Sequence, residues 1–241
     1  MERRLVVSHW SLDPLRSRRE RRSAAQAASR GGRTRLRVAG IAGLLGVLGN
    51  VAAVALLWNA PAAYKLDQLA QWVEQTFAQP IAAAASSVTF TIGLIAMAAW
   101  ASGLGRWAGG SWARSGGALI AVVSLFNAAG TLAPLVVAYH VGNCGAACDA
   151  VARGLLGTSL TLDAFFNLGL GLGLLLVGLG GTQLSRAMRA LSVVSGLLTL
   201  PVAGQAVWAP AAQWLLVAAP FWLSVMIVTS VLWVRRDPAD R

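Results

Sequence analysis

The 241-residue chain is hydrophobic and poor in charge, with 56% hydrophobic and 12% charged residues. Soluble domains carry about 25% charged residues, and a water-soluble fold of this composition would expose apolar patches large enough to aggregate. The composition therefore excludes an ordinary soluble globular domain and indicates a protein whose surface is covered by lipid.

Residues 1–37 form a basic N-terminal segment. They hold eleven of the twenty Lys and Arg residues and show no sustained apolar period. We interpret them as a disordered cytoplasmic tail, with the alternative that part of the tail folds as a helix on anionic lipid. Anionic lipid headgroups are its expected partner, at about 1 kcal/mol per basic residue near the surface. Nucleic acid is not expected, because no aromatic residues are interleaved with the arginines.

Six apolar runs follow the tail, and each is long enough to cross the hydrocarbon core, which needs about 20 helical residues. Runs of this kind predict helices, because barrel strands alternate over about ten residues and all backbone polar groups must be bonded inside the membrane. The expected fold is all-α, a six-helix transmembrane bundle over residues 38–234 followed by a cytoplasmic tail, 235–241. The predicted spans are 38–58, 81–104, 116–141, 154–181, 190–208 and 213–234.

The basic residues predict the orientation, since Lys and Arg collect in cytoplasmic loops. With the N-terminus inside, eighteen of the twenty basic residues fall on the inner side, and only Lys65 and Arg153 fall outside. Both termini are therefore expected in the cytoplasm. Tryptophans near the span ends agree, because Trp prefers the membrane interface. They are Trp58, Trp208 and Trp214 on the outer side, and Trp100, Trp107, Trp112 and Trp233 on the inner side.

The first outer loop, residues 59–80, carries a helical pattern between two prolines. Leu66, Leu69, Val73 and Phe77 recur at steps of three and four, which is typical of one helical face. The pattern predicts a short amphipathic helix that lies on the outer leaflet or caps the bundle. It either connects two spans and does no more, or serves as a lid over a ligand cavity.

Cys144 and Cys148 lie in the second outer loop, residues 142–153. An oxidising compartment permits a disulfide, and a loop can bring cysteines at this spacing together more easily than a regular helix can. A structural disulfide is the first hypothesis, and two free thiols are the alternative. A metal or redox site is disfavoured because the loop supplies no second ligand pair, so we predict no metal and no cofactor.

Asp163 is the one acidic residue inside a predicted span. An Asp near the bilayer centre costs about 2.5–3.5 kcal/mol on insertion scales and is by default a functional hypothesis. The alternative is that Asp163 is protonated or hydrogen-bonded and fixes helix packing. Asn167 lies one turn further on the same face, and Asn127, Gln205 and Asn50 are amides at membrane depth in other spans. If these faces converge, they form a polar seam that binds a ligand or ion, or that only joins helices.

His140, at the outer end of the third span, completes the set of candidate ligand or ion residues. A haem site is disfavoured because the membrane segments hold no second histidine. Gly169 and Gly173 form a small-x-x-x-small pair that lets a neighbouring helix approach closely. Pro134 and Pro201 are expected to kink the third and fifth spans.

Three segments carry a resemblance to a known group: residues 37–49, an Arg before a Gly- and Leu-rich run, residues 162–178, and Arg189 with residues 195–198. In these segments the chain resembles uncharacterised bacterial six-span membrane proteins. The resemblance implies a six-helix bundle over about residues 35–234 and no activity. The use of nineteen Arg against one Lys is typical of a GC-rich bacterial genome, so the expected location is the bacterial inner membrane.

The expected function is non-enzymatic: binding of a small ligand or lipid, or assistance to a partner in the envelope. The first alternative is a transporter or channel subunit with a proton- or cation-sensitive site around Asp163. Six helices are few for a transporter, so homo-oligomerisation stays open. A membrane enzyme is the second alternative, and no catalytic residue is predicted, because the sequence shows no paired carboxylates, His pair or Ser/His constellation in the spans and loops.

Overall fold

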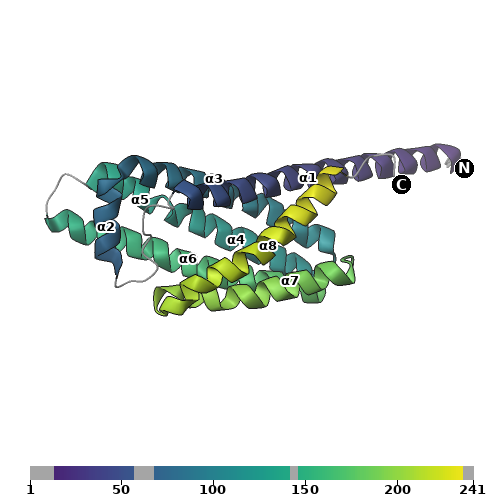
Figure 1. The fold of residues 1–241 in the computed structure, drawn as a ribbon. Coiled ribbons are helices and arrows are strands. Elements are labelled where there is room, and N and C mark those ends of the chain that lie inside the picture. Colours follow the sequence, from purple (N-terminus) through teal and green to yellow (C-terminus); the bar gives the residue numbers. More distant parts are fainter. Residues whose placement is uncertain (1–13, 57–67, 142–145, 236–241) are drawn as a thin grey trace, which may run out of the picture. The chain divides into compact units, whose positions relative to one another are not determined.

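The computed structural model describes residues 14–56, 68–141 and 146–235, and these are almost entirely helical (Figure 1). The chain divides into two units, residues 1–35 and residues 36–241. The described part of the first unit is helical and belongs to α1 (Pro14–Leu56).

Residues 14–35 are helical, where the sequence leaves open a disordered tail or a helix on anionic lipid. Ala, Arg, Gln and Leu are strong helix formers, and a helix extends from an existing turn far more easily than it nucleates. The apolar half of α1 supplies that nucleus, so the helix continues into the basic segment without needing an apolar face there.

The second unit holds the apolar half of α1 and the remaining helices. α6 continues past the turn between α7 and α8 (Figure 1). The bounds after α1 are α2 (Leu69–Ala78), α3 (Pro80–Ala108), α4 (Ser111–Gly130), α5 (Ala133–Val136), η2 (Val137–Val141), α6 (Ala146–Gly180), α7 (Arg186–Thr199), η3 (Leu200–Ala206) and α8 (Ala209–Arg235).

Six helical segments among the described residues are long and apolar enough to cross a membrane, which confirms the predicted all-helical, six-span architecture. The exposed residues of α1 support this, since Val38, Ile41, Leu45 and Leu48 form a stripe at helical spacing that suits lipid better than water. The segments are Thr34–Leu56, Pro80–Ala108, Ser111–Tyr139, Cys148–Gly180, Arg186–Gln205 and Trp214–Arg235.

Glycines set how closely the helices pack. Lipid tails are as apolar as the side chains, so helices associate in a membrane through close van der Waals contact and small residues rather than through the hydrophobic effect. A Cβ added to Gly49 of α1 would lie 2.7 Å from the Cα of Gly93 of α3, so these two backbones touch. A Cβ added to Gly169 or Gly173 of α6 would collide with side chains of α4, which confirms the predicted close approach.

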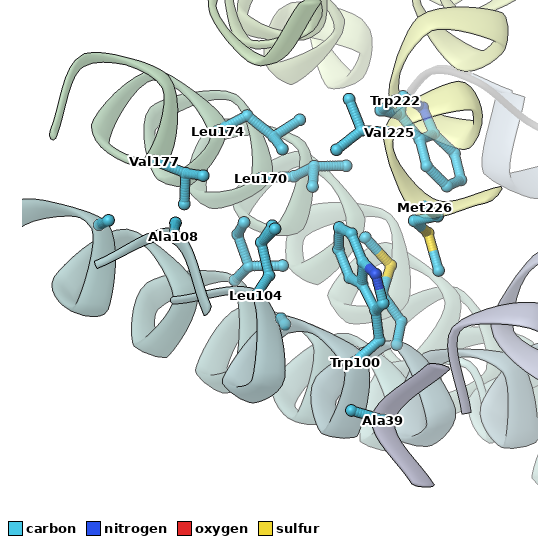
Figure 2. Packing of buried hydrophobic residues seen from close by; sticks show 14 of the residues in the cluster. Ala39, Trp100, Leu104, Ala108, Leu170, Leu174, Val177, Trp222, Val225 and Met226 are labelled. Atoms are coloured by element: carbon cyan, nitrogen blue, oxygen red, sulfur yellow. The ribbon is translucent and has the colours of Figure 1, made fainter. Parts of the chain in front are cut away.

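Side chains of α3, α6 and α8 meet in the main buried cluster, where Trp100 lies with Leu170 and Met226 (Figure 2). Trp100 and Trp233 are 0% and 1% exposed, and Trp100 donates its indole N–H to Thr229 Oγ1 at 2.9 Å. Both rings therefore pack against other helices and do not face the lipid, and their predicted depth at the interface stays a prediction. Trp112 is 62% exposed, which agrees with a belt position.

The end of the bundle at which α2 lies carries a second, smaller cluster of buried residues, the α2 cluster. There α2 packs against η2 and α6, and Val73, Val137 and Leu156 belong to this cluster. The described part of the predicted amphipathic helix therefore caps the bundle; Leu66, at the start of its predicted face, lies outside the described residues.

Candidate functional site

The third span is broken just beyond Asn127. α4 ends at Gly130, Thr131 and Leu132 form a turn, and the chain resumes as α5 and then as the π-helix η2. Pro134 has no N–H, so the carbonyl of Gly130 loses its helical donor. The predicted kink in this span is confirmed.

The fifth span is broken in a different way. α7 ends at Thr199, and η3 continues the chain as a 3₁₀ helix with Pro201 in its first turn. A 3₁₀ stretch inside a span is tighter than an α-helix and often marks a functional hinge. Gln205 lies near the end of η3, so this break decides the direction of its side chain.

Asp163 of α6 accepts hydrogen bonds from three amide side chains. Asn127 donates Nδ2 to Oδ1 at 2.9 Å, Asn167 donates Nδ2 to Oδ2 at 3.3 Å, and Gln205 donates Nε2 to Oδ2. Asn167 also donates to the backbone carbonyl of Asp163 at 2.9 Å, which holds that amide against its own helix. We call Asp163, Asn127, Asn167 and Gln205 the carboxylate–amide centre.

The three amide donors of this centre are buried. Asn127, Asn167 and Gln205 are 0%, 4% and 2% exposed, whereas Asp163 is half-buried. They come from α4, α6 and η3, so the carboxylate joins three segments of the bundle. The Oδ1 atom of Asn127 is buried and has no hydrogen-bond partner, and a buried acceptor of this kind costs about 1–3 kcal/mol.

The centre lies inside the membrane-spanning part of the chain. Asp163 is near the middle of the Cys148–Gly180 span. Measured along the helices at about 1.5 Å per residue, the four residues lie roughly 25 Å from the ends of α4, α6 and α7 that the arginines predict to be cytoplasmic.

Other polar residues that the sequence singles out do not join the centre. Asn50 donates Nδ2 to the carbonyl of Gly46 at 2.8 Å, within its own helix. Thr158 and Thr161, which precede Asp163 on α6, donate to carbonyls of their own helix. His140 lies on η2, and its side chain lies outside the described part of the structure.

Cys148 belongs to the α2 cluster and not to the centre. It is 8% exposed and disulfide-bonded. Cys144, the partner that the sequence predicts, lies outside the described residues. This pairing therefore stays a prediction.

A threonine pair next to the centre was not predicted. Thr91 Oγ1 of α3 lies 2.8 Å from Thr131 Oγ1, at the break in the third span. Thr131 follows Asn127 by four residues and so shares its face, which is the signal that could have found it. The pair ties α3 to the segment that holds Asn127.

Comparisons with protein-family models, with curated proteins and with solved structures return no match for this chain. The resemblance to uncharacterised six-span proteins stays a prediction. The fold and the centre define the class: an all-helical, multi-pass membrane protein with a hydrogen-bonded carboxylate inside its spans.

Proposed function

We propose that the protein is a transporter or channel subunit of the bacterial inner membrane, in which the carboxylate–amide centre binds a proton or another cation. One observation carries the proposal. A carboxylate within a span is held by amides from three segments, two of which lie at helix breaks.

We prefer a transporter or channel subunit, the first alternative from the sequence, to a protein that binds a small ligand or lipid or assists a partner. Acidic groups inside spans mark ion pathways and proton relays. Non-helical backbone at membrane depth is tolerated where it is buried in protein or lines an aqueous cavity. In secondary transporters, broken helices of this kind supply the coupling-ion site. The breaks beside Asn127 and before Gln205 fit that arrangement.

Location and orientation belong to the same proposal. Eighteen of the twenty basic residues lie on one predicted side, so both termini are placed in the cytoplasm by the positive-inside rule. The basic helix of residues 14–35 would there meet anionic headgroups, which attract Lys and Arg near the surface. A second copy of the chain would enlarge the small six-helix unit into a transporter of more usual size.

Ion flux in proteoliposomes tests the proposal. The purified chain would be reconstituted with an internal pH-sensitive dye, and proton, sodium and potassium gradients would be applied with the membrane potential clamped. We expect the natural sequence to dissipate one of these gradients faster than protein-free liposomes. D163N should reduce that rate to the protein-free rate, because it removes the only charge of the centre.

D149N provides the matched control. Asp149 lies on the same helix but in an exposed pair with Arg153, 2.8 Å apart, and such pairs contribute about 0–1 kcal/mol. The D149N variant should therefore conduct ions like the natural sequence. Equal flux in D163N and the natural sequence, with both folded by size-exclusion chromatography, would refute the proposal and leave Asp163 as a packing residue.

A further inference from the structure

The hydrogen bonds at Asp163 leave little room for a ligand. An ionised carboxylate offers about four lone-pair positions. Asn127 uses one on Oδ1, and Asn167 and Gln205 use two on Oδ2. One position on Oδ1 stays open. It does not suit a metal ion such as Mg²⁺ or Ca²⁺, which takes six or more oxygen ligands.

The residues around Asp163 also disfavour a metal ion. The described residues contain no group of three or more His, Cys, Asp or Glu side chains that could hold a metal ion. The groups facing the carboxylate are amides from α4, α6 and η3. Asp149 and Arg153, further along α6, are paired with each other, and Arg153 lies about 15 Å from Asp163 along the helix.

Asn127 offers a partner for a protonated carboxyl group. Its Oδ1 atom is fully buried and accepts no hydrogen bond, while its Nδ2 atom donates to Oδ1 of Asp163. Rotation of this amide by half a turn would bring its oxygen to the place of its nitrogen. The amide then accepts from a carboxylic acid where it had donated to a carboxylate.

We propose that the ligand of the centre is a proton, taken up on Oδ1 of Asp163 and held there by the side-chain oxygen of Asn127. This inference rests on the proposed function and names its ion. One O–H bond forms, the negative charge is neutralised, and the amide of Asn127 turns from donor to acceptor. No other reactant takes part.

Protonation has a consequence for the fifth span. Gln205 is tied to Asp163 from the 3₁₀ segment η3. A hydrogen bond to a charged group contributes about 1.5–3 kcal/mol, against about 1 kcal/mol for a neutral one. Neutralising Asp163 therefore weakens the link to η3, and this change couples proton uptake to movement of the broken span.

Infrared difference spectroscopy tests the inference. Spectra of the full chain in lipid nanodiscs would be recorded across a pH titration. We expect the carbonyl stretch of protonated carboxyl groups to grow as the pH falls, with one component that is present in the natural sequence and in D149N and missing from D163N. Aspartate labelled with heavy carbon in its carboxyl group should move this component, which assigns it to an aspartate, and its presence in D149N excludes Asp149. N127L should keep the band at a shifted frequency, because it removes the acceptor.

Each contrary result is informative. A band that ignores the label, that persists in D163N or that never forms would overturn the proton site. Sodium, potassium or magnesium that changes the carboxylate bands at constant pH in the natural sequence but not in D163N would assign a metal cation instead. A titrating Asp163 in a protein without flux would refute transport and leave the proton site standing.

Discussion

Asp163 shows how a charged group is accommodated inside the bundle. Its insertion costs about 2.5–3.5 kcal/mol, and each charge-assisted hydrogen bond returns about 1.5–3 kcal/mol. Three amide donors therefore offset the cost. Three neutral hydrogen bonds between helices would not offset this cost, because such bonds contribute about 0.6 kcal/mol on average in one membrane protein.

At this scale we predict that Q205L destabilises the protein by about 1.5–3 kcal/mol, because it removes a donor to a charged acceptor. The free energy of unfolding would be measured by denaturant titration in mixed micelles. Q183L is the matched control, since Gln183 is exposed, and it should stay within about 0.5 kcal/mol of the natural sequence. Equal losses in the two variants would show that Gln205 contributes through shape alone.

The broken fifth span decides which way Gln205 points. An α-helix turns about 100° per residue, whereas a 3₁₀ helix turns about 120°. Between Leu200 and Gln205 this difference adds up to about 100°. An unbroken α-helix would carry Gln205 away from Asp163. The centre therefore depends on the form of η3 and on Pro201, which ends α7.

At the scale of elements we predict that P201A lengthens α7 and removes ion flux without loss of stability. Alanine restores the N–H that the carbonyl of Leu197 needs and is about 3 kcal/mol more favourable than proline inside a helix. Circular dichroism would report the added helix, and the liposome assay the flux. P220A is the control, because Pro220 lies inside α8. Normal ion flux in P201A would mean that flux does not depend on the 3₁₀ form of η3.

At the scale of the whole molecule, the helices of residues 36–235 are tightly packed. Within the described residues, the ion pair between Asp149 and Arg153 is exposed and joins neighbouring turns of α6, so it does not hold one helix to another. Cohesion comes instead from glycine contacts, such as Gly116 of α4, where an added Cβ would lie 2.5 Å from the carbonyl oxygen of Gly173. Close approach of this kind fits helices that assemble within lipid.

At the scale of the molecule we predict that both termini face the cytoplasm, because most basic residues lie on that side. Fusion of green fluorescent protein to the C-terminus should fluoresce in a bacterial host, and fusion of alkaline phosphatase there should be inactive. Fusions placed after Val207, in the outer turn between the fifth and sixth spans, should show the opposite pattern. Active phosphatase at the C-terminus would show that the C-terminus faces away from the cytoplasm and would refute this orientation.

Sequence alone determined the spans and one half of the centre. Length and hydropathy are local properties, so the six spans follow from them. Asp163 and Asn167 share a face because they are one turn apart on one helix. The depth of Asp163 within its span is equally local.

Only the tertiary structure decided which other residues meet Asp163. Asn50, Asn127 and Gln205 looked alike in the sequence, yet Asn50 bonds its own helix and the other two reach the carboxylate. The same holds for Trp100, which the structure places between helices. Periodicity gives the direction of a side chain about its own helix axis. No local pattern encodes the rotation and depth of that helix relative to its neighbours. They arise from the glycine contacts and from the geometry of the breaks at Pro134 and Pro201, whose positions alone the sequence predicts.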